Sequence, residues 1–487
     1  MMKIKFSFYN QLIPIEETSE YLLYNILNGG LRVLDDSTGR LLLDLSNLDS
    51  FNVEDYNEYH DVIQELLDEG FLVDFYIDEK ESYQQDYLDS QLAKYRNNSH
   101  IGLTIGTTIL CNMGCPYCFQ TVKPNKTLRD EKVINGIVTY IGGLIQKAPV
   151  KKWAGLSIMW YGGEPLINMD VIENLTTKFT ALCSQHHIPY DASMVTNGIL
   201  LTRETWQFLL KHQVNSIQIT IDGAKEVHDS YRPLKSANGK NYEKILENLS
   251  MMPLGISATI RINTDKRVAA TLPKLLDDLK DYGIWPQRQN QVSLKLAWLR
   301  GYAGADTSNM RFLAQQEFFD IENQFSAMLV ERYNKWAKSN SREMAKQKWK
   351  LPEKQNDCAT YVSPYFFTFD PEGGIHKCWE TIHEKEKSSG STVFKNWDVD
   401  DFKKYLNYSR TNVHPVCYNC KFNPICEGLS CAYDTIHTLS EQNFPCTPWK
   451  TEIDRYFKEM YLRMKQNPDQ VVLHKPEQRA HQTHSNK

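Results

Sequence analysis

The sequence predicts an α/β fold built around a partial (β/α)6 barrel that is similar to part of a TIM barrel. Six strand-like segments alternate with helical patterns between about residues 100 and 300. Their carboxyl ends lead into loops that carry Gly, Asn or Cys, where such folds place their chemistry. The segments on either side lack this alternation, so we expect additional modules at both ends.

Apolar alternation and turn residues locate the elements of the barrel. The predicted strands span Gly102–Thr108, Leu156–Trp160, Ala192–Thr196, Ser216–Ile221, Ser257–Ile262 and Val292–Ala297. Periodic apolar residues predict helices near Asp130–Ile145, Asp170–Gln185, Arg203–His212, Asn241–Met251 and Leu272–Asp281. This order predicts a parallel sheet with helices on its outer face.

The flanking segments differ from the barrel in composition. The apolar stretch Tyr21–Leu45, a helix near Val53–Glu69 and a strand at Phe71–Tyr76 indicate a small α+β module. We expect the following parts: 1–77, the α+β module; 78–99, a linker helix; 100–300, the barrel; 301–355, a helical bridge; 356–450, a cysteine-rich domain; and 451–487, a helix with a disordered tail after about Asn467.

Composition excludes several functional classes. The 487 residues carry a formal net charge of −5 with both signs interspersed, so no basic stripe indicates nucleic-acid binding. No apolar run is long enough for a membrane span, and the first residues do not resemble a signal peptide. We therefore expect a cytoplasmic protein that binds neither nucleic acid nor membrane.

The eleven cysteines are clustered along the chain. None precedes Cys111, Cys183 stands alone among apolar helix positions, and the last seven lie between Cys358 and Cys446. An odd number in tight groups is more typical of metal ligands in a reducing compartment than of a disulfide framework. Cys183 is expected to be a core residue.

The first group, Cys111-x3-Cys115-x2-Cys118, directly follows the first predicted barrel strand. Three thiolates on one loop can hold three irons of a [4Fe–4S] cube and leave the fourth iron open. The alternatives are a zinc site, which favours four ligands, and three buried structural thiols. The spacing and its position resemble the radical S-adenosylmethionine (SAM) superfamily, in which the open iron binds SAM and its reductive cleavage gives a 5′-deoxyadenosyl radical.

Further motifs follow in the order that this resemblance implies. Gly162-Gly163-Glu164-Pro165 is similar to the loop that holds the methionyl amino group, and Thr220-Ile221-Asp222-Gly223 precedes His228-Asp229 and Arg232 as in peptide-modifying members. Arg232 would pair with the SAM carboxylate, for which a guanidinium is suited. The resemblance implies cofactor-binding roles for Tyr117, Gly162, Gly163, Glu164, Pro165, Thr196, Asn197, Thr220, Arg232 and Arg261. For Thr196-Asn197-Gly198 a plain turn is the alternative, and for Tyr117 it is simple packing.

The later cysteines resemble the SPASM domain, the extension that carries two auxiliary clusters in such enzymes. One spacing departs from the usual pattern, with four residues between Cys426 and Cys431. The resemblance implies Cys358, Cys378 and Cys431 as ligands of auxiliary cluster I, and Cys417, Cys420, Cys426 and Cys446 as ligands of auxiliary cluster II. Seven cysteines leave one of eight ligand positions to another side chain, water or a substrate thiolate. Binding of structural zinc by these seven cysteines is the alternative.

Together these resemblances imply an oxidoreductase that uses SAM and three [4Fe–4S] clusters to modify a ribosomally synthesised precursor peptide (a RiPP maturase). The N-terminal module resembles winged-helix elements that bind leader peptides, or it is a structural cap. A thioether cross-link is the first choice, followed by a carbon–carbon cross-link and epimerisation. Trp379 occupies the position where sulfatase maturases carry a catalytic aspartate, which disfavours that activity. A redox sensor without SAM turnover is the non-enzymatic alternative. A flavodoxin or ferredoxin would donate electrons.

Overall fold

The computed structural model describes residues 3–121, 125–236, 241–301, 305–358, 362–393, 403–405, 407–438, 446–468 and 471–474. The chain divides into two compact units. The barrel unit comprises Ala93–Arg342 and Cys358–Asn407, and the terminal unit comprises Met1–Leu92, Glu343–Asp357 and Tyr408–Lys487. Among the described residues, no helix combines the length and apolar character needed to cross a bilayer. These units cut across the boundaries predicted for the cysteine-rich segment.

The barrel unit is built on one large sheet in which six strands lie side by side in chain order. These strands are β7 (His100–Thr108), β8 (Gly155–Gly162), β9 (Tyr190–Thr196), β10 (Val214–Thr220), β11 (Ser257–Thr264) and β12 (Val292–Trp298). Each pairs in parallel with the next. The predicted partial (β/α)6 barrel is therefore confirmed, and its strands extend at most two residues beyond the predicted limits at either end, except that β10 ends one residue earlier.

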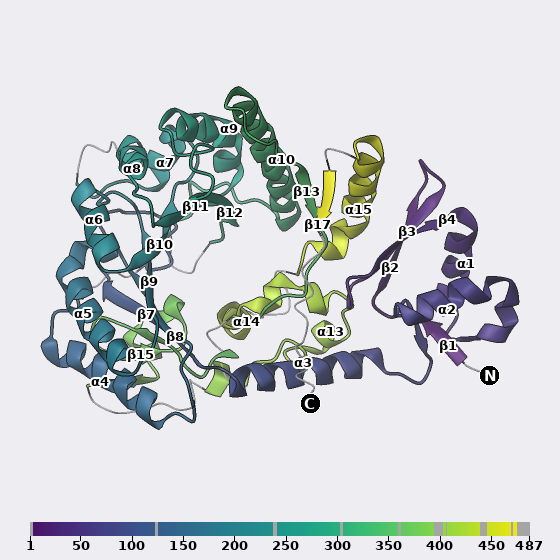
Figure 1. Cartoon of the computed structure of the whole chain (residues 1–487), viewed down its shortest axis with the longest axis horizontal. Coiled ribbons are helices and arrows are strands. Elements are labelled where there is room, and N and C mark those ends of the chain that lie inside the picture. The colour runs from purple at the N-terminus through teal and green to yellow at the C-terminus, as the bar shows by residue number, and fades with distance from the viewer. Residues whose placement is uncertain are drawn as a thin grey trace. The chain divides into compact units, whose positions relative to one another are not determined.

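Helices connect these strands and lie on the outer side of the sheet (Figure 1). They are α4 (Glu131–Lys147), α5 (Met169–Gln185), α6 (Arg203–Lys211), α7 (Lys225–Tyr231), α8 (Asn241–Ser250) and α9 (Lys266–Asp281). Side chains cap several of them: the carboxylate of Asp130 accepts from Lys132 N at the start of α4, and that of Asp265 accepts from Arg267 N and Val268 N at the start of α9. The helix α7 was absent from the sequence prediction, because seven residues give too short an apolar pattern.

The two faces of the barrel strands differ in polarity. On β11, Ala258, Ile260 and Ile262 are buried in the core between sheet and helices. The alternating residues Thr259 and Arg261 lie on the other face and are only partly buried. Because side chains alternate along a strand, the inner wall of the barrel is polar while its outer face supplies the core.

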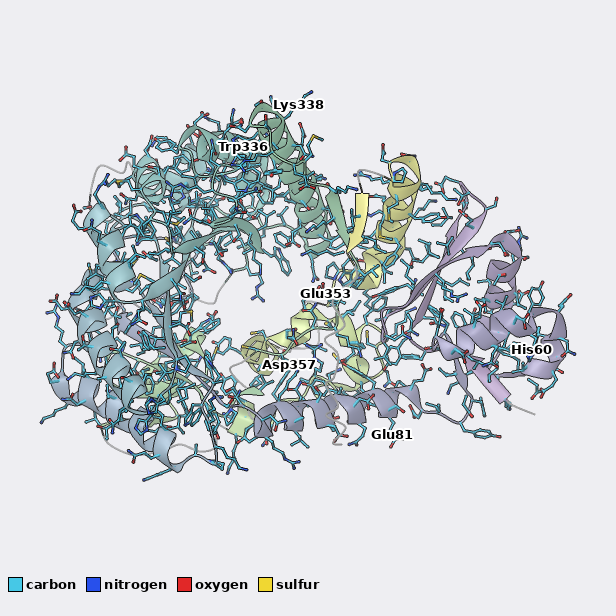
Figure 2. The ribbon with its side chains drawn as sticks, in the orientation of Figure 1. His60, Glu81, Trp336, Lys338, Glu353 and Asp357 are labelled. Carbon is cyan, nitrogen blue, oxygen red and sulfur yellow. The ribbon has the colours of Figure 1, made fainter. Side chains whose placement is uncertain are left out.

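Three short strands extend the sheet beyond β7. They are β14 (Phe366–Phe369), β15 (Gly374–His376) and β16 (Gly390–Ser391), and β14 pairs in parallel with β7. The hairpin β14–β15 and the strand β16 follow in antiparallel order. The long helix α10 (Gln315–Ser339) contacts β12 and α9, and Figure 2 shows Trp336 and Lys338 near its end. The start of the predicted cysteine-rich domain thus belongs to the barrel sheet.

The N-terminal part of the terminal unit contains two small antiparallel sheets. One has the order β5 (Phe51–Asn52), β1 (Lys3–Phe6) and β6 (Leu72–Asp74), and the other joins β2 (Asn10–Ile15), β3 (Glu20–Asn25) and β4 (Leu31–Asp35). Its helices are α1 (Asp36–Ser46), α2 (His60–Asp68) and α3 (Glu79–Arg96). Asp35 caps α1 by accepting from Thr38 N, a signal that is hidden when Tyr21–Leu45 is treated as one apolar stretch.

The C-terminal part of this unit contains α13 (Pro415–Tyr418), α14 (Ala432–Thr438) and α15 (Trp449–Gln466). The strand β13 (Gln347–Lys350) pairs in parallel with β17 (Val471–His474). The expectation of disorder directly after Asn467 is therefore wrong for residues 471–474, whose β-branched and apolar side chains favour a strand. The rest of the predicted tail, 475–487, lies outside the described residues.

Candidate active site

The candidate site lies at the carboxyl ends of the barrel strands. The loop with Cys111, Cys115 and Cys118 follows β7, and Gly162-Gly163-Glu164 ends β8. Thr196 ends β9, and Thr220 ends β10. Parallel strands bring all these positions to one edge of the sheet, so the structure collects motifs that are dispersed over more than a hundred residues.

The cysteine loop is held by backbone and side-chain hydrogen bonds. Gly114 N donates to Pro233 O at 2.8 Å, and Cys118 N donates to Cys115 O at 3.2 Å. Met113 N donates to the sulfur of Cys111 at 3.4 Å. Burial raises the pKa of the Cys115 thiol to about 11, the nearby Arg232 lowers it, and the neighbouring Cys118 and Cys111 raise it further. The thiols of Cys118 and Cys111 therefore lie within electrostatic range of Cys115.

Two glycines bring the end of β8 into close contact with the cysteine loop. Gly163 N donates to Thr108 O at 2.8 Å, and Glu164 N donates to Leu110 O at 2.9 Å. A Cβ atom at Gly163 would lie 2.1 Å from Leu110 O, and Gly162 has φ of +127°. No larger residue fits this approach without moving the backbone. The two glycines thus allow the backbone at Glu164 to lie directly against the cysteine loop.

Glu164 is fully buried and accepts three hydrogen bonds. Its Oε1 accepts from Thr196 Oγ1 at 2.8 Å and from Leu166 N at 3.1 Å, and its Oε2 accepts from Asn197 N at 2.8 Å. Burial raises the pKa of Glu164, and these hydrogen bonds oppose the shift. A carboxylate has about four lone-pair positions, so one acceptor position on Oε2 remains for a further donor such as an ammonium group. Thr196 and Asn197 act here as supports of Glu164.

A second buried network joins Tyr117, Asp222 and Arg232. The hydroxyl of Tyr117 donates to Asp222 Oδ2 and accepts from Arg232 Nη1 at 2.7 Å. Asp222 Oδ1 accepts from Asn263 N at 2.9 Å. Burial raises the pKa of Asp222, while Arg232 and Tyr117 oppose that shift. Tyr117 is therefore more than a packed ring, because its hydroxyl links the cysteine loop to the ends of β10 and β11.

Sequence reasoning assigned no role to Asp222, Asn263 or His228 within this network. Asp222 N donates to His228 Nδ1 at 3.1 Å, so that ring nitrogen is the unprotonated one. Arg261 directs its Nε to Asn263 Oδ1 at 3.0 Å, and its cofactor-binding role stays a prediction. Asp222 and His228 belong to the motif that begins at Thr220, so the sequence contained a signal for both. The contact between Asn263 and Asp222 joins neighbouring strands and left no trace in the sequence.

These residues fit SAM and a cluster on structural grounds. The Nε of Arg232 is buried and has no hydrogen-bond partner among the described residues, which leaves a guanidinium donor for a carboxylate. Thr220 is buried beside this network at the end of β10. Within the described chain, no three His, Cys, Asp or Glu side chains are placed to hold one metal ion. A cubane differs from such a site, because each thiolate binds a different iron.

The later cysteines are distributed over both units. Burial raises the pKa of Cys417 to about 11, and the nearby Cys426, Cys420 and Cys446 raise it further, so these three thiols lie within electrostatic range of Cys417. Backbone N–H groups of Leu429 and Thr447 donate to the Cys426 sulfur. Cys358 and Cys378 belong to the barrel unit and Cys431 to the terminal unit, so their grouping stays a prediction.

Cys183 is set apart from these groups. It lies on α5, is 2% exposed and belongs to the hydrophobic core of the barrel unit. Burial raises the pKa of its thiol to about 11. The expectation that Cys183 is a core residue is confirmed.

Comparison with known proteins finds relatives that match the barrel part of the chain. The sequence profile of the radical SAM superfamily matches residues 105–262. The radical SAM cyclopropyl synthase TigE of Paramaledivibacter caminithermalis is 27% identical over 257 residues, which cover 48% of this chain and 52% of TigE. A cysteine-type anaerobic sulfatase-maturating enzyme of Clostridium novyi is 25% identical over 144 residues, covering 29% of this chain and 37% of that enzyme. The matches thus span about half the length of these relatives or less.

The fold comparison is broader than the sequence comparison. The structure titled native anSMEcpe with bound AdoMet and Cp18Cys peptide superposes with a TM-score of 0.52 at 14% identity. The superposition covers 76% of this chain and 99% of that chain. At this identity the likeness shows a shared fold. Residues 105–262 therefore match the radical SAM superfamily, and the cysteine loop at the end of β7 lies within this match.

Proposed function

We propose that this enzyme cleaves SAM reductively and uses the resulting radical to oxidise a ribosomally synthesised precursor peptide. One observation carries the proposal. Arg232 offers a buried, unpartnered Nε among the described residues, and the carboxylate of Glu164 keeps a free acceptor position at the same end of the barrel. These two groups match the carboxylate and ammonium of an amino acid moiety, which SAM carries.

The chain's own residues prepare this site. Cys111, Cys115 and Cys118 would hold a [4Fe–4S] cluster, which when bound supplies the electron that cleaves the SAM sulfonium to a 5′-deoxyadenosyl radical. Gly162, Gly163 and Pro165 shape the loop that presents Glu164, and Thr196 and Asn197 orient its carboxylate. Tyr117 and Asp222 orient Arg232, and Thr220 borders the SAM pocket. The polar network excludes water, because its carboxylates are fully buried.

A thioether cross-link is the preferred product. We assign Cys358, Cys378 and Cys431 to auxiliary cluster I and Cys417, Cys420, Cys426 and Cys446 to auxiliary cluster II, which gives three [4Fe–4S] clusters in total. The electrostatic effect of Cys426, Cys420 and Cys446 on Cys417 supports the second group. Seven cysteines leave one ligand position open, where a substrate cysteine thiolate is a suitable occupant. Its thiol would lose a proton and its sulfur would bond to the carbon from which the deoxyadenosyl radical had taken a hydrogen atom, and the one electron released on closing this bond would pass to an auxiliary cluster.

A carbon–carbon bond within the peptide is the second candidate. The relative TigE is named a cyclopropyl synthase, and its similarity covers 48% of this chain. Such ring closure also removes two hydrogens, as does a cross-link to an aromatic ring. Epimerisation, sulfatase-type oxidation and redox sensing rank below these two reactions.

The remaining partners follow from this assignment. The N-terminal module, with its three-stranded sheet β2–β3–β4, would bind the leader part of the precursor by strand addition. A flavodoxin or ferredoxin would supply electrons in the cytoplasm. We propose residues 78–99 as a linker helix and 301–355 as a bridge, while the predicted cysteine-rich segment 356–450 is shared between the two compact units.

The test is anaerobic co-expression with a short peptide encoded beside the gene, followed by intact mass measurement. Wild-type enzyme should remove two hydrogens per bond formed, and Cys111→Ala should abolish the change, with Cys183→Ala as the matched cysteine control. Alkylation with iodoacetamide separates the candidates: a thioether consumes a peptide thiol, whereas a carbon–carbon bond leaves every thiol reactive. An unchanged peptide mass, together with no release of 5′-deoxyadenosine, would refute the proposed function.

A further inference from the structure

A pair of cations lies on the inner wall of the barrel, next to the site described above. In the register of the parallel strands, Arg261 of β11 lies directly opposite Lys295 of β12. The alternating neighbours Ile260 and Ile262 on β11, and Leu296 on β12, are buried in the core. Both cations therefore stand on the polar inner face.

This placement also borders the SAM network. Two residues further along β11, Asn263 directs its Nδ2 to the Tyr117 hydroxyl at 3.4 Å. Arg261 is close enough to Asp222 to affect its pKa electrostatically, as a minor influence after burial, Arg232 and the hydrogen bonds. The pair thus lies one strand away from residues that surround the proposed SAM pocket. A group held there would be beside the position of the radical.

Protein stability gives no reason for this pairing. Like charges at directly opposite positions of neighbouring strands repel one another, which destabilises the sheet. Lys295 is exposed and makes no hydrogen bond or ion pair within the described residues, and Arg261 bonds only to the neutral side chain of Asn263 there. The chain as a whole is acidic, with a net charge of −5, so the pair does not reflect general basicity.

The layer below the pair is neutral and already satisfied. Thr259 Oγ1 and Ser293 Oγ, which are also opposite in the register, hydrogen bond to each other at 3.0 Å. These two hydroxyls carry no charge, and Asp222, a carboxylate in electrostatic range of Arg261, already accepts from Tyr117 and Asn263. A carboxylate brought by a ligand would find an Arg fork and a Lys ammonium on the same wall.

We propose that Arg261 and Lys295 bind a carboxylate of the substrate peptide, an Asp or Glu side chain close to the residue that is modified. This inference rests on the proposed function and specifies the class of its substrate as acidic near the reacting position. A side-chain carboxylate anchored on β12 would orient the neighbouring peptide carbon toward the SAM pocket. The same chemistry is present in the carboxylate of SAM, so the experiment must separate the two sources.

The experiment uses the reconstituted full-length enzyme with SAM and a displayed library of random dodecapeptides that contain one fixed cysteine. Peptides retained by wild type should be enriched in Asp and Glu at one position relative to that cysteine, by about tenfold over the input. Lys295→Gln should lose this enrichment, and Lys295→Glu should select Lys and Arg instead. Lys244→Gln, on the outer helix α8, is the matched control and should select as wild type does.

Equilibrium dialysis with radiolabelled SAM, on the same proteins, distinguishes the sources of the carboxylate. A rise of about tenfold in the SAM dissociation constant of Lys295→Gln would assign the pair to SAM and overturn the proposal. Equal acidic enrichment by Lys295→Glu and wild type would also overturn it, as would a wild-type pool that shows no acidic enrichment or no binding. If SAM is still cleaved in that case, the proposed function survives while the substrate class does not.

Discussion

Replacing Glu164 by glutamine separates the two tasks assigned to this carboxylate. Glutamine keeps the shape but presents one oxygen and one NH2 group. If its oxygen takes the Oε1 position, it accepts from Leu166 N and Thr196 Oγ1 as before. The NH2 group then faces the N–H of Asn197, which is 2.8 Å from the carboxylate in the native protein. A buried donor without an acceptor costs about 1–3 kcal/mol.

The affinity for SAM should fall more steeply than the free energy of unfolding. A hydrogen bond to a charged group contributes about 1.5–3 kcal/mol, so losing the pairing with an ammonium predicts SAM binding weaker by about 10- to 150-fold. Equilibrium dialysis under anaerobic conditions measures the affinity, and urea unfolding measures the stability. Glu173→Gln on the outer surface of α5 is the matched control, with an expected change in stability within about 0.5 kcal/mol.

Two results would refute this reasoning. If Glu164→Gln is destabilised yet binds SAM like wild type, the carboxylate is only a structural support of the loop. If both the free energy of unfolding and the SAM affinity stay unchanged, the hydrogen bond from Asn197 N to the Glu164 carboxylate contributes to neither.

Three other substitutions test the architecture around the site, all measured by urea unfolding. Gly163→Ala should destabilise the protein by at least about 1–3 kcal/mol, because the added Cβ would lie 2.1 Å from a backbone oxygen. The control Gly143→Ala, at an open position of helix α4, should stabilise it by about 0.5–1 kcal/mol. Equal effects of the two substitutions would contradict the close approach at Gly163. Burial, and after it the charge of a nearby arginine, lowers the pKa of His228 well below 6.5. At low pH the unfolded chain therefore takes up a proton that the folded protein does not. The free energy of unfolding should fall as the pH drops below about 6.5, by up to about 1.4 kcal/mol per pH unit. His228→Asn should flatten this dependence and exposed His187→Asn should not; a steep slope that persists in His228→Asn would exclude this histidine as the cause. Arg410→Leu should lower the free energy of unfolding by about 3–5 kcal/mol, because it leaves the buried carboxylate of Asp357 without its cation. In the native protein this side chain is 1% exposed and lies 2.9 Å from Arg410 Nε. A loss below about 1 kcal/mol would show that the pair is not buried in solution.

The barrel was predictable from the sequence because its strands are apolar on the face that packs against helices. Ile101, Leu103 and Ile105 on β7 illustrate this pattern, and all three are buried. Helix α7 escaped detection because it is only one or two turns long, and α1 was concealed by the apolar residues before its cap. The addition of β14 to β7 joins segments more than 250 residues apart, and such pairing leaves no local pattern.

The candidate site was predictable to a different degree. The residues of the cysteine loop and Glu164 stand in compact motifs, so their chemistry could be inferred from spacing. The hydroxyl of Tyr117 meets Arg232 across 115 positions of sequence, and no periodicity encodes that contact. The sequence therefore predicted the candidate binding groups, while their hydrogen-bonded supports could be found only in the fold.

The position of Tyr117 between Cys115 and Cys118, which we propose as cluster ligands, has a thermodynamic consequence. Its hydroxyl ties the loop to Asp222 and Arg232, so ordering the loop and ordering the SAM contacts are one event. If binding of the cluster strengthens binding of SAM by some free energy, then binding of SAM must strengthen binding of the cluster by the same free energy. Saturating SAM should therefore slow the loss of iron to a chelator, and Tyr117→Phe should uncouple the two. SAM would then protect the proposed cluster at which it is cleaved.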